Sequence, residues 1–263
     1  MKKCTTLLWT PLLALWWRDI IRFLRQRNRI IGALATPLVF WLLVGSGFGP
    51  SFYQKGSAAT ESYLVYFFPG ILLLIMLFTA IFSTISVIED RREGFLQGAL
   101  VAPLSPVVIP LSKFLGGTTL ALLQALFFCL LAPLAGIHLG AVQLLLLLPA
   151  LLLAGFSMTG LGFLVAWPMD STQGFHAIMN IFLMPLWMMS GALFPMPEGS
   201  GWLYLVGRFN PVSYCVSAIR DALMMGRAAT SLTDYYISLL ITALFGAATL
   251  AMSFYLVAHP KKK

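Results

Sequence analysis

The chain has 263 residues, of which 59% are hydrophobic and only 10% are charged, whereas soluble domains carry about 25% charged residues. This composition excludes a soluble globular protein and favours a protein whose main solvent is lipid. The net charge of +8 does not indicate nucleic-acid binding, because the lysines and arginines cluster at the chain ends and beside apolar blocks. The three cysteines stand far apart and predict neither a disulfide nor a metal site.

Residues 1–29 form a segment rich in tryptophan and arginine that precedes the first long apolar block. Arg18, Arg22, Arg25 and Arg29 follow helical spacing on one stripe, and apolar residues such as Trp16 lie largely opposite. The pattern predicts an amphipathic helix at the membrane interface. Two interpretations remain open: an anchor for anionic lipid that sets topology, or a lever that also contacts a cytoplasmic partner. The segment lacks the features of a cleaved signal peptide.

Residues 30–263 contain apolar blocks that are each long enough to cross a bilayer as a helix, which takes about 20 residues. The predicted spans are 30–48, 63–88, 114–137, 142–167, 175–194 and 237–257. The fold class that follows is an all-α membrane protein with six transmembrane helices.

Positive charges set the expected orientation, because short loops rich in Lys and Arg stay in the cytoplasm. They occur in the N-terminal segment, beside the second connection (Arg91, Arg92 and Lys113) and in the tail (261–263). Six spans bring all three to one side, so both termini are predicted to be cytoplasmic. The stretch from 195 to 226 falls on the outer side, and its apolar runs are too short to cross, which predicts short re-entrant or interfacial helices.

The connection after the second span carries dense charge of both signs, then a short apolar run, then prolines. This pattern suits a segment that docks into another protein, over about 89–102. The residues predicted to make this contact are Glu89, Asp90, Arg91, Arg92, Glu93, Gly94, Phe95, Leu96, Leu100 and Pro103.

Two motifs resemble those of the membrane subunits of ABC-2 type exporters, the drug- and Nod-factor-exporter-like permeases. The first family pattern is close to E-R-E-x-G-T-L-E-x-L-L-V-x-P-x-S, and the chain departs from it at Phe95, Gln97 and Ala99. The second is S-G-x-x-F-P, then N-P-x-x-Y and an arginine. The residues that match the second pattern are Ser190, Gly191, Phe194, Pro195, Asn210, Pro211, Tyr214 and Arg220.

The resemblance implies a type V exporter-like architecture in the bacterial inner membrane, with 89–102 as the coupling helix and 195–226 as outer re-entrant helices. It also implies two copies of a separate ATPase subunit and a second membrane half, expected to be another copy of this chain. The sequence itself contains no G-x-x-x-x-G-K-[ST] loop, so ATP and Mg²⁺ are expected on the partner and no cofactor on this chain. The expected cargo is amphipathic, lipid-like or drug-like.

Small polar and flexible side chains mark two spans as a possible substrate path. Thr79, Ser83 and Ser86 share a face of the second span. The fifth span adds Asn180, Met184 and Met188. The alternative is that such residues only hold helices together.

Two other functions compete with an ATP-driven permease. An ion-coupled secondary transporter would need carboxylates within its spans, and an intramembrane enzyme would need a clustered catalytic set. Asp170, Gln173 and His176 are the only nearby set and lack a nucleophile or a metal spacing, so no catalytic or metal-binding residue is predicted.

Overall fold

The computed structural model describes residues 6–48, 63–96, 98, 105–195, 201–225 and 231–259. The regular elements among these residues are all helical, which confirms the predicted all-α class. Six of the described helices are long and apolar enough to span a membrane. They are α2 (Arg27–Phe48), α3 (Tyr63–Arg92), α5 (Val108–Cys129), α6 (Ala141–Ala166), α7 (Thr172–Trp187, extended by the π-helical segment η3, Met188–Ala192) and α10 (Leu232–Ala258).

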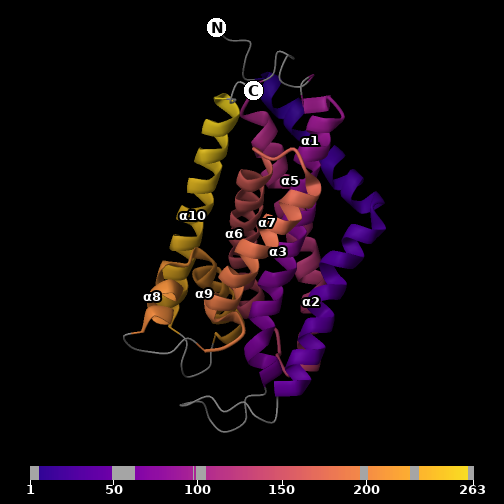
Figure 1. The fold of residues 1–263 in the computed structure, drawn as a ribbon. Helices are drawn as coiled ribbons and strands as arrows, with labels where there is room; N and C mark the ends of the chain where they lie inside the picture. The colour runs from indigo at the N-terminus through magenta and orange to yellow at the C-terminus, as the bar shows by residue number, and fades with distance from the viewer. Residues whose placement is uncertain are drawn as a thin grey trace.

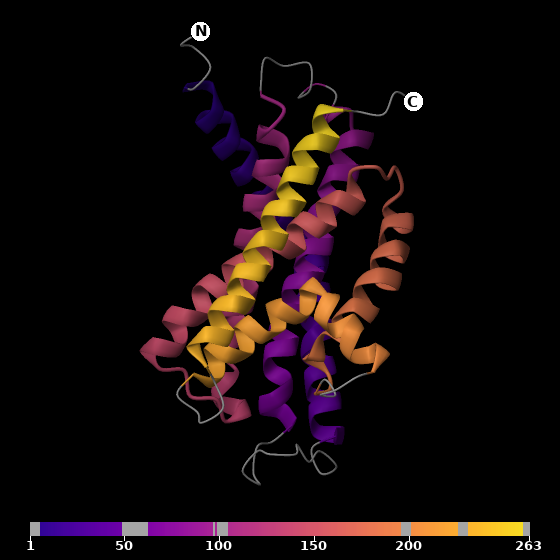
Figure 2. The same cartoon turned by 90° about the vertical axis from the view of Figure 1, so that its left-hand side faces the viewer.

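The shorter helices lie at the two ends of this bundle (Figure 1). Helix α1 (Thr6–Arg25) lies where the last turns of α3 and α10 end, and we name this the charged end. At the opposite end are η2 (Ala132–Ala135), α8 (Trp202–Phe209) and α9 (Pro211–Met224). Turning the molecule shows α10 running diagonally from α8 and α9 back to the charged end (Figure 2). The even number of spans therefore returns the chain to the end at which it starts.

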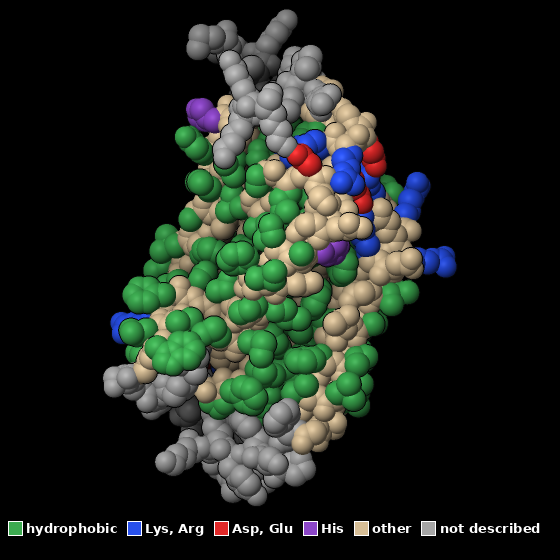
Figure 3. All heavy atoms as spheres, in the orientation of Figure 1, with side chains coloured by type: hydrophobic (Ala, Val, Ile, Leu, Met, Phe, Trp, Pro, Cys, Tyr) green, Lys and Arg blue, Asp and Glu red, His purple; other side chains and the backbone are tan. Residues whose placement is uncertain are grey.

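Helix α3 is the centre of the bundle. It is the most hydrophobic of the six spans, and 83% of its apolar window is buried inside the protein. It packs against α2, α5, α6 and α7. The outer helices leave many large apolar side chains exposed. On the face shown in Figure 3, hydrophobic side chains cover the middle of the molecule and most of the charged side chains lie toward one end. This distribution is the one expected where lipid covers the outside.

The structure corrects several predicted helix boundaries. The second span continues to Arg92 and not only to 88, because the charged side chains of its last turn form ion pairs and hydrogen bonds with other helices of the chain. The third begins at Val108 and ends at Cys129, since Pro133 and Gly136 (φ 81°) form a 3-10 turn that stops the helix before residue 137. The sixth begins earlier, at Leu232, where the hydroxyl of Ser231 accepts a hydrogen bond from the backbone N–H of Thr233.

Candidate functional site

At the charged end, eight ionisable side chains from four helices and from the turn after α3 meet in one cluster, which we call the ion-pair network. Helix α1 packs mainly against α5, which packs against α3, and α1 makes smaller contacts with α2 and α3. The four bases and four acids of the network balance in formal charge. They are Arg18, Arg22, Arg29 and Lys113, with Asp19, Glu89, Asp90 and Glu93.

Asp90 is the centre of the network, and only 2% of its side chain is exposed. Its carboxylate accepts hydrogen bonds from Lys113 Nζ, Arg18 Nη2 and Arg22 Nη1, each at 2.7 Å. A carboxylate removed from water is stable only where donors replace the lost hydration. Three cations from α1 and α5 do this for Asp90, so the carboxylate ties α3 to both helices.

Lys113 is buried at the start of α5, with 6% of its side chain exposed. Its ammonium donates to Asp90 Oδ2 at 2.7 Å, to Asp19 at 3.0 Å and to the hydroxyl of Ser86 at 2.9 Å. Its three N–H donors are therefore matched by three acceptors from α1 and α3. The prediction counted Lys113 among the topogenic cations beside the second connection, but the structure uses it as an internal link.

The predicted arginine stripe faces the acidic end of α3, but it is divided between two helices, because α1 ends at Arg25 and Arg29 belongs to α2. Arg22 Nη2 lies 2.9 Å from Glu93 Oε1 and 3.2 Å from Glu89 Oε2, and Arg29 pairs with Glu89. Burial alone would lower the pKa of Arg22, but Asp90, Glu89 and Glu93 outweigh it and raise that pKa above its ordinary value. Of the predicted stripe, only Arg25 is exposed. The amphipathic helix thus contacts the chain's own carboxylates with most of its charge.

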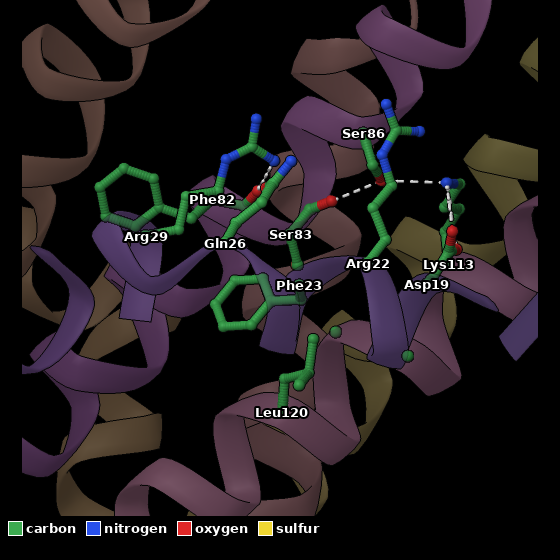
Figure 4. A pocket seen from close by; sticks show the side chains of 12 residues that line it. Asp19, Arg22, Phe23, Gln26, Arg29, Phe82, Ser83, Ser86, Lys113 and Leu120 are labelled. Carbon is green, nitrogen blue, oxygen red and sulfur yellow. Dashed lines mark hydrogen bonds and ion pairs between the residues drawn. The ribbon is translucent and has the colours of Figure 1, made fainter. Parts of the chain in front are cut away.

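Helix α1 contacts α5 at Trp16 and at Gly116. Trp16 Nε1 donates to Thr119 Oγ1 at 3.2 Å. A side chain at Gly116 would stand 3.5 Å from the Cβ of Asp19, so α1 lies almost on the backbone of α5. A small pocket remains between α1, α3 and α5, with Gln26, Ser83 and Lys113 on its wall (Figure 4).

The predicted coupling segment divides into two parts. Glu89 to Arg92 form the last turn of α3 and are held within the chain, which differs from a separate coupling helix that starts at 89. Arg91 donates to the carbonyl oxygens of Trp167 and Met169, and Arg92 Nε donates to that of Asp170 at 2.8 Å. Both arginines therefore hold the turn between α6 and α7.

After α3, a turn at Glu93 and Gly94 leads into a short helical stretch that begins at Phe95. Glu93, Gly94 and Phe95 are exposed, and we call these three residues the coupling turn. Gly94 has φ 76°, a left-handed conformation that glycine adopts without strain. The Phe95 side chain is 40% exposed, and the Arg18 guanidinium lies 3.8 Å from its ring centroid. Leu96 is buried. Leu100 and Pro103 lie outside the described residues.

The predicted substrate path also divides into two parts. Thr79 donates a hydrogen bond to Gln124 Oε1 of α5 at 2.6 Å, and Ser86 accepts one from Lys113. Ser83 packs closely against Gly117 of α5, since a Cβ at that glycine would stand only 2.9 Å from Ser83 Oγ. These three contacts lie between α3 and α5 of one chain and agree with the helix-packing interpretation. On α7, by contrast, Asn180 and Met188 are exposed and Met184 is half-buried.

At the opposite end, the second motif builds one joint around a break in the fifth span. Gly191 has φ 78° within η3, and its carbonyl oxygen accepts hydrogen bonds from Tyr66 Oη at 2.8 Å and from Arg220 Nη2 at 2.7 Å. The Arg220 guanidinium also lies over the Tyr66 ring, 4.5 Å from its centroid. Arg220 therefore fastens α9 to the broken end of α7.

The remaining motif residues complete this joint. Asn210 caps α9, because its Oδ1 accepts from the Val212 N–H at 3.0 Å and its Nδ2 donates to the Leu186 carbonyl oxygen at 2.6 Å. Pro211 follows at the first helical position, which its fixed φ favours. Ser190 donates to Trp187 and Tyr214 to Arg208, in both cases to the carbonyl oxygen, while Phe194 and Pro195 lie exposed. With 8 and 14 residues, α8 and α9 are too short to cross a bilayer.

Sequence reasoning missed Asp19, Tyr66 and Gln124 as functional or structural partners. Asp19 is a lone acid in a basic helix, and Gln124 is a lone amide in an apolar span. Isolated polar residues of this kind usually bind a partner, so both could have been predicted as contact residues. Tyr66 carried none, because its role depends on a carbonyl oxygen 125 residues away.

Comparison with known proteins agrees with this geometry. Residues 10–224 match the family model of ABC-2 type transporters. The chain is also 29% identical over 205 residues to a protein of Cyanophora paradoxa whose name describes it as a transport permease, ycf38. That match covers 77% of this chain and 70% of the relative. Both matched regions are long enough to take in most of the spans.

Proposed function

Because the chain belongs to the ABC-2 type transporter family, and is thus a multi-pass membrane permease subunit, we propose that it forms half of the membrane path of an ATP-driven exporter. The coupling turn carries this proposal: it presents Glu93 and Phe95 outward, while Arg22 and Arg18 bind the same two side chains from behind. Such a turn can receive force from a partner and pass it to α1 and α3.

The energy source is proposed to be a separate ATPase subunit that holds ATP and Mg²⁺. This chain has no phosphate-cradling loop, so hydrolysis belongs to the partner. Two ATPase copies and two permease copies would form the working complex. The mixture of one acid, one exposed ring and a flexible glycine in the coupling turn suits a docking contact in which charge fixes the register.

The ion-pair network gives the proposed coupling a mechanical basis. A displacement of the coupling turn would move Glu93 and the end of α3. The ion pairs of Asp90 and Glu89 with Arg22 and Arg29 would then pass the movement to the end of α1 and the start of α2. Lys113 transmits the same displacement to α5 through Asp90. A stroke applied at one turn would therefore reach three spans at their charged ends.

The path for the cargo is proposed to run along the outer face of α7, between two copies of the chain. An exposed amide such as Asn180 is unfavourable against hydrocarbon, which supports a covering partner or a polar path at this face. The neighbouring Met184 and Met188 are flexible and polarizable, and such surfaces accept varied amphipathic molecules. Drug-like or lipid-like cargo fits this lining best.

The proposed setting is the inner membrane of a bacterium, with the charged end in the cytoplasm. The described arginines of α1, the start of α2 and the end of α3 lie at this end, and short basic segments stay on the cytoplasmic side. The coupling turn then faces the compartment that contains ATP.

An ion-coupled mechanism draws less support from the same residues. Asp19 and Asp90 are buried carboxylates, which such a mechanism needs. Both are neutralised by Lys113 and by arginines of α1, and they lie at the charged end of the bundle, away from its middle. They are better suited to hold helices than to carry an ion.

The proposal is tested by purifying the permease together with its ATPase after Phe95→Ala. We expect the amount of co-purified ATPase to fall at least tenfold, because Phe95 is the large apolar side chain that the coupling turn exposes. Phe209→Ala is the matched control, since Phe209 is an even more exposed phenylalanine at the opposite end. It should leave the complex intact.

A second variant, Glu93→Lys, reverses the charge of the coupling turn without touching the apolar contact. We expect it to weaken the complex and to make the remaining binding less sensitive to salt. If both variants bound the ATPase and supported ATP-dependent transport as well as the unmodified chain does, the coupling turn would not be the docking site.

A further inference from the structure

Helix α1 has three distinct faces, and one of them has no partner in the described chain. Leu12, Ile20 and Phe23 are buried against the bundle, and the paired arginines face α3. The third face exposes a strip of four large apolar side chains. This strip consists of Trp9, Leu13, Trp17 and Leu24.

At one end of the strip lie two arginines that differ from the others of this region. Arg25 ends α1, Gln26 separates the helices, and Arg27 begins α2. Both arginines are exposed, and neither has an acidic partner within 4.0 Å among the described residues, whereas Arg18, Arg22 and Arg29 all do. The space-filling view shows basic side chains projecting from the molecule at this end (Figure 3).

The position of this corner fits the headgroup layer of a bilayer. The first apolar span begins at Arg27, so the corner marks the boundary between hydrocarbon and water. Tryptophans concentrate at this depth, and Trp9 and Trp17 lie on the exposed strip of the helix that leads to it. A guanidinium can bind a phosphate through two parallel hydrogen bonds, and phosphate is the anionic group that the headgroup layer supplies.

We propose that the α1–α2 corner binds anionic phospholipid through Arg25 and Arg27, while the strip of α1 lies among the acyl chains. Charge complementarity identifies the occupant, because these are the exposed arginines of the corner whose charge no described carboxylate balances. The inference requires that the chain spans a membrane and does not depend on the ATPase. Because Arg22 of the same helix holds Asp90 and Glu93, bound lipid would also fix α1 against the coupling turn.

The test uses the purified full-length permease without ATPase and measures lipid binding by native mass spectrometry. The probes are phosphatidylglycerol and phosphatidylcholine with identical acyl chains. We expect a preference for phosphatidylglycerol that falls about fivefold for each of Arg25→Gln and Arg27→Gln, as follows from about 1 kcal/mol per basic side chain near an anionic surface. Lysine at both positions should retain most of the preference, and added salt should reduce it.

Arg208→Gln is the matched control, because Arg208 is an exposed arginine on α8 at the opposite end of the molecule. Thermal unfolding of every variant establishes that it is folded. Equal binding of the two lipids by the unmodified chain would overturn the proposal, as would a loss in Arg208→Gln equal to that in Arg25→Gln. So would an Arg25→Gln, Arg27→Gln double variant that keeps its lipid preference but no longer binds the ATPase, since the corner would then be a protein contact.

Discussion

The carbonyl oxygen of Gly191 accepts two hydrogen bonds from side chains that are distant in sequence, Tyr66 and Arg220. The break in the fifth span exposes this oxygen, and an unpaired carbonyl at membrane depth costs several kcal/mol. The glycine of the motif therefore makes the break possible, and the arginine of the motif satisfies the polar group that the break frees.

We predict that Arg220→Gln destabilises the protein by about 2 kcal/mol and Tyr66→Phe by about 1 kcal/mol, since a charged donor contributes more than a neutral one. Chemical denaturation in detergent would measure both effects. The double variant should lose less than the sum, because the two side chains share one acceptor and contact each other. Strict additivity would contradict the shared joint.

Asp221, the neighbour of Arg220 on α9, predicts a dependence of stability on pH. Burial raises the pKa of Asp221 to about 6; Arg220 opposes this shift and Asp234 adds to it. The folded protein therefore favours the protonated acid. The resulting stability is present below the ordinary pKa of 3.8 and is lost as pH rises through about 6.

Asp221→Asn cannot ionise, so it should be more stable than the unmodified chain above pH 6, by about 1 kcal/mol after allowing for solvent screening of this half-buried group. Below pH 4 the two proteins should unfold at the same temperature. Melting curves followed by intrinsic fluorescence at pH 4, 5, 6 and 7 would measure the difference. A gap that stays constant across this range would rule out titration of Asp221.

Single residues were predicted best where a local rule applies. The sequence Asn210–Pro211 is typical of a cap followed by a first helical residue, and these residues have those positions in α9. Arg220 was grouped correctly with the Ser190–Gly191 motif, but its contact with Tyr66 was not predictable, because the partner lies in a span with no polar pattern around it. Thr79 and Ser83 share a face as expected, yet only the structure reveals that α5 covers it.

At the scale of elements, α1 is held by charge and close packing together. Gly116 of α5 lies in van der Waals contact range of α1, and Asp19, Arg18 and Arg22 of α1 reach the buried Lys113 and Asp90. Removing one partner of a buried ion pair strongly destabilises a protein, because the other charge is left buried and unbalanced. The intact pair itself contributes little to the free energy of unfolding compared with apolar side chains of similar size.

We therefore predict that Lys113→Met destabilises the protein by about 3–5 kcal/mol, because it leaves Asp19 and Asp90 with fewer donors. Adding Asp19→Asn to this variant should recover part of the loss by removing one unbalanced charge. Asp90 still has Arg18 and Arg22 and needs no change. A loss in Lys113→Met that Asp19→Asn deepens would show that the network is not organised around Lys113.

Helix existence followed from composition, whereas helix ends did not. Six apolar blocks predicted six spans, and these are present. The end of α3 was placed too early, since charged residues at the edge of a span suggest a loop unless their partners are known. Those partners come from α1, about 70 residues away, and no local pattern reveals them.

At the scale of the molecule, the charged end and the opposite end are expected to face different compartments. The charged end contains the coupling turn and the α6–α7 turn, and the opposite end contains η2, α8 and α9. An even number of spans, with the first and the last described residues at the charged end, makes this a single, testable topology.

We predict that His138→Cys, at the opposite end, reacts with a membrane-impermeant maleimide in intact cells, whereas Gln173→Cys, at the charged end, reacts only after permeabilisation. Both positions are exposed, and the described cysteines, Cys129 and Cys215, are buried. Cys4 would be replaced by serine first. Labelling in the reverse order would invert the proposed orientation and place the coupling turn outside the cell.

The central claim, that this permease depends on an external ATPase acting through the coupling turn, is tested most directly by ATP hydrolysis in proteoliposomes. The permease alone should hydrolyse no ATP. Adding the ATPase should give an activity that exceeds that of the ATPase alone, and Phe95→Ala in the permease should abolish the excess while Phe209→Ala preserves it. An ATPase whose rate is the same with the unmodified permease, with Phe95→Ala and without any permease would contradict the account.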